Sequence, residues 1–293
     1  MSLTILYRGP LSSCNYECHY CPFAKRHESR EELAADQTAL ERFVAWCARS
    51  CGPTEPLRVF FTPWGEALVR RWYRDAFRKL TNMRHVQRVA AQTNLSCRLD
   101  WLSDCDADKV GLWCTYHPSQ TDRERFLHQV ARLAELGVSH SVGMVGLRED
   151  LDEIERLREL LPTSTYLWVN ALKREPDYYS LEDLRRLTAV DPQFPVNNRR
   201  HPSLGKHCLT GEQVITVDGA GDIRRCHFVP EVLGNIYDDH WSEALRPRKC
   251  TNDSCGCHIG YIHMPSLELY SIYGDGLLER RPATGTLTGA PSS

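Results

Sequence analysis

Three cysteines near the N-terminus have the type and spacing needed to hold a metal centre. Cys14, Cys18 and Cys21 follow the spacing C-x3-C-x2-C. Thiolates bind iron–sulfur clusters and zinc, and a loop this short can direct three of them at one centre. Three protein ligands would leave one iron of a four-iron cluster open to another molecule. A structural zinc ion is the alternative, with His19 or His27 as the fourth ligand.

Five more cysteines gather in the C-terminal third of the chain. They make a second group that is large enough for another metal centre, either a second iron–sulfur cluster or a zinc ribbon. The whole chain has 13 cysteines, an odd number, and its N-terminus has no signal-peptide pattern, so metal binding is favoured over a disulfide framework. The members of this group are Cys208, Cys226, Cys250, Cys255 and Cys257.

The composition is that of an ordinary soluble protein. Of 293 residues, 42% are hydrophobic and 25% charged, and the formal net charge is −2. This balance does not favour binding to nucleic acid or to a membrane surface, and no apolar run reaches the length of a membrane span. We therefore expect a cytoplasmic protein.

Short apolar runs alternate with segments of helical periodicity along the first 190 residues. Thr121 with Glu124, and Ser180 with Asp183, predict capping boxes that open two of the helices. The expected strands are Leu3–Tyr7, Leu57–Phe61, Val86–Ala91, Val110–Cys114, Ser139–Val145 and Tyr166–Asn170. The expected helices cover 36–50, 66–81, 98–105, 122–136, 150–160 and 180–187.

Six strand–helix repeats predict an α/β fold, a partial (β/α)6 barrel with parallel strands. Functional groups of such sheets lie in the loops after the strands, where Cys14, Cys18 and Cys21 are found. After this 1–190 core we expect a linker over 191–206. A small β-hairpin and helix iron–sulfur domain over 207–281 and a disordered tail over 282–293 complete the expected organisation.

The first cysteine motif resembles the signature of the radical SAM superfamily, in which an aromatic residue precedes the last cysteine, here Tyr20. The resemblance implies that Cys14, Cys18 and Cys21 hold a [4Fe–4S] cluster whose open iron chelates S-adenosylmethionine (SAM). An electron from that cluster would cleave SAM to methionine and a 5′-deoxyadenosyl radical. The cofactors carry this chemistry, and the protein orients them and excludes water.

The turn after the second expected strand resembles the Gly-Gly-Glu motif of the same superfamily. It reads Trp64-Gly65-Glu66, with Trp64 in place of the first glycine. The resemblance implies that this turn contacts the amino group of SAM, with the Glu66 carboxylate as a charge-assisted partner. The alternative is an ordinary strand-to-helix turn with Glu66 in the first turn of the helix.

Polar residues follow three further expected strands. Asn94 belongs to a segment that resembles a Thr-Asn-Gly motif of the superfamily, with Leu95 in the glycine position. Thr115 and Asn170 end the fourth and sixth expected strands. The resemblance implies that these side chains contact SAM or substrate, although polar residues commonly end strands for other reasons.

The second cysteine group resembles the twitch and SPASM domains that extend some radical SAM enzymes. Cys208, Gly221 and Cys226 match the pattern C-x12-G-x4-C, and Leu233–Ile236 resembles a further segment of those domains. The resemblance implies one auxiliary [4Fe–4S] cluster held by Cys208 and Cys226. Two of three further cysteines would complete its ligand set: Cys250, Cys255 and Cys257.

Three functions follow from these patterns. The first is hydrogen abstraction that oxidises or crosslinks a residue of a peptide or protein. The second is oxidation or rearrangement of a sugar-like small molecule. Both would need an electron donor such as flavodoxin or ferredoxin. The third is a non-catalytic iron–sulfur or zinc protein, against which the open three-cysteine site argues. The sequence does not identify the substrate.

Overall fold

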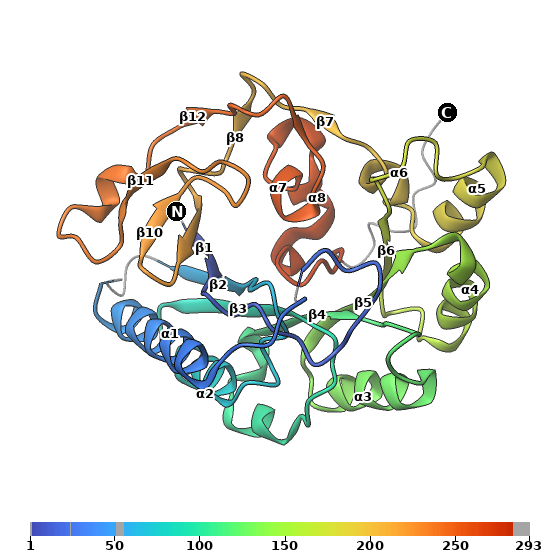
Figure 1. The fold of residues 1–293 in the computed structure, drawn as a ribbon, viewed down its shortest axis with the longest axis horizontal. Helices are drawn as coiled ribbons and strands as arrows, with labels where there is room; N and C mark the ends of the chain where they lie inside the picture. Colours follow the sequence, from blue (N-terminus) through green and yellow to red (C-terminus); the bar gives the residue numbers. More distant parts are fainter. Residues whose placement is uncertain (1, 24, 51–55, 284–293) are drawn as a thin grey trace.

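The computed structural model describes residues 2–23, 25–50 and 56–283. In this part of the chain, a nine-stranded sheet with the order β11-β10-β9-β1-β2-β3-β4-β5-β6 curves around the centre of the molecule (Figure 1). Neighbouring strands from β1 to β6 are all parallel, as six strand–helix repeats predict. These strands are β1 Leu3–Arg8, β2 Leu57–Phe61, β3 Val86–Thr93, β4 Val110–Thr115, β5 Ser139–Gly146 and β6 Leu167–Ala171.

Helices connect successive strands and cover the outer face of the sheet (Figure 1). The mixed α/β fold with a large, mostly parallel sheet is thus confirmed. The segment expected as a helix over 98–105 is a 3-10 helix, η1 Asp100–Asp104. The α-helices are α1 Arg30–Ser50, α2 Arg71–Thr81, α3 Arg123–Glu135, α4 Leu151–Leu160 and α5 Leu181–Val190.

Of the two capping boxes predicted from the sequence, one is confirmed and the other is wrong. Ser180 and Asp183 form the capping box expected at the start of α5. At the start of α3 the capping box of Thr121 and Glu124 is wrong, because Asp122 is the N-cap and accepts a hydrogen bond from the backbone N–H of Arg125. A carboxylate one residue later performs the same capping function.

Alternate residues of the strands face two different cores, as the period of a β-strand requires. In β1, Ile5 and Tyr7 pack beneath the outer helices, whereas Leu6 faces the inside of the barrel. In β4, Leu112 packs outward and Trp113 inward. Both faces of these strands are therefore apolar, and the near-continuous apolar runs in the sequence reflect this double burial.

The predicted hairpin is present and continues the barrel sheet. β9 Val214–Asp218 pairs in parallel with β1, and β10 Asp222–Arg224 and β11 Val232–Asn235 follow as antiparallel strands. Gly221 has a φ of 93°, the left-handed conformation that glycine adopts without strain. The domain boundaries expected near 190 and 207 stay a prediction, because the sheet itself crosses from the N-terminal strands to the hairpin.

C-terminal helices fill the inside of the barrel. Helices α7 His258–Tyr261 and α8 Leu269–Tyr273 lie within the curve of the sheet (Figure 1), and their apolar side chains pack against Leu6 and Trp113. The last described residues include a fully buried pair, Glu279 and Arg280. The C-terminal segments therefore fill part of the space inside the curve of the sheet.

The segment expected as a linker over 191–206 contains the short helix α6 Phe194–Asn197 and strand β7 His201–Pro202. Two small two-stranded sheets pair β8 His207–Cys208 with β12 Arg248–Lys249, and β7 with β13 Ser254–Cys255. Of the expected disordered tail, residues 284–293 lie outside the described residues. None of the described helices combines the length and apolar character that crossing a bilayer requires.

Candidate active site

The three N-terminal cysteines lie on the loop between β1 and α1, at the carboxyl edge of the sheet. Cys18 is buried, and Cys14 and Cys21 are partly exposed. A turn brings the last two together, since the backbone N–H of Cys21 donates to the carbonyl of Cys18 at 3.1 Å. Burial, with smaller contributions from the nearby Glu66, Cys18 and Cys21, raises the pKa of the Cys14 thiol to about 11. The three thiols therefore lie on one short loop and interact with one another, and their role as cluster ligands stays a prediction.

Two carboxylates fix the base of this loop. Glu28 accepts hydrogen bonds from the backbone N–H groups of Ser12 and Ser13, at 2.8 and 3.2 Å. Asp36, fully buried on α1, accepts from the backbone N–H of Leu11 at 3.1 Å. Burial raises the pKa of Asp36, while its hydrogen bonds from Trp72, the Leu11 backbone and Tyr73 lower it. The cysteines are thus held by a loop whose preceding residues are tied to α1 and its N-terminal flank.

The turn after β2 packs directly against the cysteine loop through Gly65. A Cβ atom on Gly65 would lie 1.8 Å from the carbonyl oxygen of Ser13, a distance that no side chain tolerates. The backbone N–H of Glu66 donates to that same oxygen at 3.2 Å, and the N–H of Trp64 donates to Leu11 at 3.1 Å. Only glycine permits this approach, which sets the position of the cysteine loop above β2.

Glu66 is buried and joins the ends of β2 and β3. Its Oε1 accepts from the Leu68 N–H at 3.0 Å and from the Thr93 hydroxyl at 2.8 Å, and its Oε2 accepts from the Asn94 N–H at 2.6 Å. Burial raises the pKa of Glu66 to about 7, against these three hydrogen bonds. Because α2 begins only at Arg71, Glu66 does not lie in a first helical turn, and that alternative is wrong.

Asn94 reaches from the end of β3 to the cysteine loop. Its side-chain amide donates to the Asn15 side chain at 3.0 Å and lies 3.8 Å from the Cys14 sulfur. Leu95 follows with a φ of 56°, in the left-handed region that favours glycine. Leu95 therefore adopts a backbone conformation that a glycine at this position would take without strain.

Tyr20 and Trp64 both face other aromatic or cationic side chains. The Tyr20 hydroxyl is 2.6 Å from Nδ1 of His117, in the loop after β4. Trp64 is 40% exposed and packs against Phe23, with ring centroids 4.2 Å apart and the rings tilted by 37°. The Arg8 guanidinium lies 4.0 Å from the centroid of the Trp64 ring. Trp64 thus covers the strand ends next to the cysteine loop.

Two further residues expected at the site, Thr115 and Asn170, lie at the ends of later strands. Thr115 is half-buried at the end of β4, and Asn170 is exposed in β6. Their strands lie in the same sheet as β1, β2 and β3. A role for either side chain toward SAM stays a prediction.

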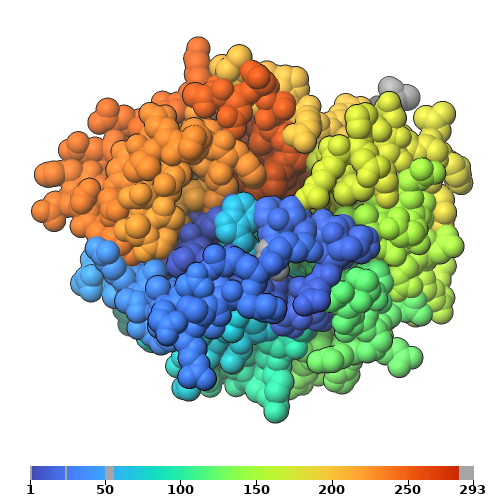
Figure 2. Space-filling model, in the orientation of Figure 1, coloured from blue at the N-terminus to red at the C-terminus, as the bar shows by residue number. Residues whose placement is uncertain are grey.

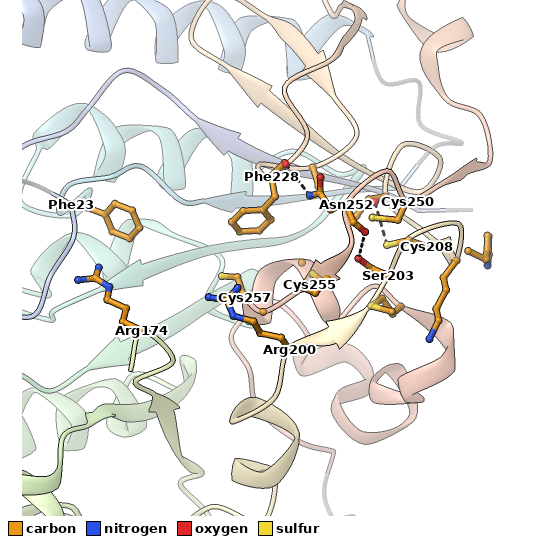
Figure 3. Close-up of a pocket in the computed structure, with 18 residues that line it drawn as sticks. Phe23, Arg174, Arg200, Ser203, Cys208, Phe228, Cys250, Asn252, Cys255 and Cys257 are labelled. Carbon is orange, nitrogen blue, oxygen red and sulfur yellow. Dashed lines mark hydrogen bonds between the residues drawn. The ribbon is translucent and has the colours of Figure 1, made fainter. Parts of the chain in front are cut away.

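The five C-terminal cysteines line one pocket of about 400 Å³ (Figure 3). Arg225, which is buried, supports this pocket by donating to the carbonyls of Arg248 and Lys249 beside β12. A Cβ on Gly260 would lie 2.8 Å from the Cys255 sulfur, so this glycine lets α7 approach the cysteine. The lining cysteines are Cys208, Cys226, Cys250, Cys255 and Cys257.

The thiol groups of the N-terminal cysteine loop and of the C-terminal pocket are suitable ligands for iron–sulfur clusters. Each offers at least three thiols, and polar hydrogens approach the sulfurs: the Tyr16 N–H lies 3.4 Å from Cys14 Sγ, and the Thr210 hydroxyl 3.2 Å from Cys208 Sγ. Hydrogen bonds to sulfur are one means by which proteins tune such clusters. Within the described ranges, no three His, Cys, Asp or Glu side chains already stand at the distances that hold one metal ion.

The pocket opens between parts of the chain that are distant in sequence. In the space-filling view, the surface is hollowed where the blue N-terminal loop meets the orange and red C-terminal segments (Figure 2). Phe23, two residues after Cys21, lines the same pocket as the C-terminal cysteines. Phe23 therefore brings the end of the N-terminal cysteine loop to the pocket that the C-terminal cysteines line.

Solved structures of known proteins share the fold of this chain. Native anSMEcpe with bound AdoMet (SAM) and a Cp18Cys peptide matches over 83% of this chain and 80% of its own, with a TM-score of 0.55 and 15% identity. A histidine-tagged form of anSMEcpe with bound AdoMet matches over 90% and 81%, also with a TM-score of 0.55 and 15% identity. The chain has the anSMEcpe fold. The structural kinship expected from the radical SAM resemblance is thus confirmed at the level of the fold.

The sequence comparisons add no assignment. No protein-family model matches the chain, and no curated protein matches it either.

Residues that sequence reasoning missed are those that position the cysteines. Glu28 and Asp36 anchor the cysteine loop, and Phe23 and Arg8 contact Trp64. Glu28 and Phe23 lie close to the motif in sequence, which was the available signal. Nothing local indicated that Asp36, on a helix, binds back to the loop.

Proposed function

We propose that this chain is a radical SAM enzyme. Cys14, Cys18 and Cys21 would hold a [4Fe–4S] cluster, and when bound there with SAM it supplies methionine and a 5′-deoxyadenosyl radical. The observation that carries the proposal is the placement of the motif. The three-cysteine loop is fixed against the Trp64–Glu66 turn by Gly65, at the strand ends of a fold shared with an AdoMet-bound protein.

Within this proposal, the chain's own residues orient SAM and limit water. Asn94, held by Glu66 and lying beside Cys14, would position the polar groups of SAM next to the cluster. Trp64 and Phe23 form an aromatic cover at the edge of the same loop. Tyr20 and His117 join the loop to the end of β4. Thr115 and Asn170 are proposed as further contacts on the later strands.

We also propose an auxiliary [4Fe–4S] cluster in the C-terminal pocket. Burial, and to a smaller extent the four other cysteines of the group, raise the pKa of Cys255 to about 12, so Cys255 interacts with every other member of the group. Cys257 also interacts with Arg8, on the barrel side, and shares the interaction with Lys173 with Cys255. We assign the ligands as Cys208, Cys226, Cys250 and Cys255.

The substrate that we propose is a residue of a peptide or protein, which the radical would oxidise or crosslink by hydrogen abstraction. The support is the pocket lined by the C-terminal cysteines and by Phe23 of the N-terminal loop, and the peptide bound in the anSMEcpe structure. Reduced flavodoxin or ferredoxin is the proposed electron donor, and the cytoplasm the proposed compartment. A sugar-like small molecule is the alternative substrate for the same site.

A SAM cleavage assay tests the proposal. Anaerobically reconstituted protein is reduced with dithionite, and 5′-deoxyadenosine and methionine are measured by mass spectrometry. We expect both products in equal amounts from the wild type. Changing Cys14, Cys18 and Cys21 together to Ala should remove all cleavage and about half of the iron. Cleavage that survives this triple change would overturn the assignment of the SAM site.

A further inference from the structure

The C-terminal pocket has a wall that its cysteines do not explain. In Figure 3, Phe23, Arg174, Arg200 and Phe228 lie toward one end of the pocket, away from Cys208. Phe23 and Phe228 are 44% and 40% exposed, unusual values for phenylalanine in a folded chain. Their exposure at the mouth of a cavity indicates a surface for an apolar group of a ligand.

The charges of the lining are of one sign. Arg174, Arg200 and Lys206 are exposed at the pocket, and no Asp or Glu is found among the described residues that line it. None of the three forms a salt bridge within 4.0 Å to another described residue. A cavity lined by cations without counter-charges raises the local concentration of anions.

A bound cluster with four thiolates would itself be anionic, so some cations are expected for balance. Lys173 meets part of that need, because this half-buried residue interacts electrostatically with Cys255, one of the proposed ligands. Arg174 and Arg200 are instead exposed residues of the pocket lining, where their guanidinium groups are accessible to a ligand.

Arg200 is held in place by the backbone next to the cysteines. A Cβ on Gly256 would lie 3.2 Å from Nη1 of Arg200 and 3.3 Å from its Cγ, so the Arg200 side chain packs on the backbone at Gly256. Arg174 follows Lys173, whose ammonium donates to the carbonyls of Asn197 and Gly256. Both arginines are thus attached to anchored backbone, which favours a defined geometry over free surface motion.

We propose that Arg174 and Arg200 form an anion-binding subsite that recognises a carboxylate or phosphate of the substrate, while Phe23 and Phe228 pack against its apolar part. Guanidinium groups suit this task because their planar forks bind both anions with paired hydrogen bonds. The inference rests on the proposed function, in that the ligand of this subsite is the substrate of the radical reaction.

Binding to the reconstituted protein, measured by anaerobic isothermal titration, tests the subsite without use of activity. The peptide probe is a blocked Asp-Phe dipeptide, with blocked Asn-Phe as its neutral counterpart. The small-molecule probe is phenyl phosphate, with phenol as its counterpart. We expect at least one acidic probe to bind about tenfold or more tightly than its counterpart. Which probe shows the preference distinguishes an acidic peptide from a phosphorylated small molecule.

The double change Arg174→Gln and Arg200→Gln should remove that preference. Arg199→Gln is the matched control, because Arg199 is an exposed neighbour that does not line the pocket, and this variant should keep the preference. Equal binding of acidic and neutral probes to the wild type, or a preference that survives the double change, would overturn the subsite. If the protein cleaves SAM but binds acidic and neutral probes equally, only the subsite is refuted. If it prefers the acidic probe but does not cleave SAM, only the proposed function is refuted.

Discussion

Replacing Glu66 with Gln probes the contact between the sheet and the SAM site. Three donors converge on this carboxylate: the backbone N–H groups of Leu68 and Asn94 and the hydroxyl of Thr93. A glutamine amide has one acceptor oxygen, so its NH2 group must face at least one of these donors. A buried donor left without a partner costs about 1–3 kcal/mol. We expect Glu66→Gln to lose stability in that range near neutral pH.

The size of this loss should depend on pH in a defined direction. The pKa of Glu66 is about 7 in the folded protein, against an ordinary value of 4.5. The folded state therefore binds the proton more tightly, and the stability that this gives is present at low pH and lost as the pH rises through 7. From about pH 6 to about pH 8.5, the wild type should lose roughly 1 kcal/mol that the glutamine variant does not lose.

The assay is denaturant unfolding of both proteins at the two pH values, with SAM affinity measured by titration. Glu31→Gln is the control, because Glu31 is exposed on α1. Since Glu66 positions Asn94 beside Cys14, we expect SAM affinity to fall about tenfold or more with full iron content. A stability difference that is identical at both pH values, together with unchanged SAM affinity, would refute this role of Glu66.

Three further predictions concern the clusters. Anaerobically purified protein should be brown and contain about eight irons with matching sulfide, and a colourless protein with stoichiometric zinc would contradict both cluster assignments. Gly65→Ala should displace the cysteine loop, because the alanine Cβ would clash with the Ser13 carbonyl, and the iron content should fall by about half. A full iron content would show that the loops tolerate the change. Changing Cys208 and Cys226 to Ala should spare the first cluster, measured by iron content, but lower the melting temperature of the C-terminal region, measured by calorimetry. Loss of both clusters would contradict their independence.

The sequence was sufficient for the barrel because its signals are local. Each parallel strand is buried on both faces, so apolar runs such as Val110–Thr115 stand out, and the helices between them carry one apolar stripe each. The two cysteine groups were equally visible, since their spacing is a property of short segments.

What the sequence did not indicate depends on contacts between distant segments. The pairing of β9 with β1 joins residues about 210 positions apart, and no local pattern encodes it. The contact of Gly65 with Ser13 and the hydrogen bond from Leu11 to Asp36 are of the same kind. Such partners are selected by the packing of the whole chain, which is why the anchors of the cysteine loop emerged only from the structure.

The central claim is that the cysteine loop holds a cluster with an iron open to SAM. Electron paramagnetic resonance of the dithionite-reduced Cys208→Ala, Cys226→Ala variant tests it directly, because only the first cluster should remain. We predict a reduced four-iron signal whose shape changes when SAM is added, and no such signal when Cys14, Cys18 and Cys21 are also changed to Ala. A cluster signal that SAM leaves unchanged, or one that persists without these three cysteines, would contradict the account.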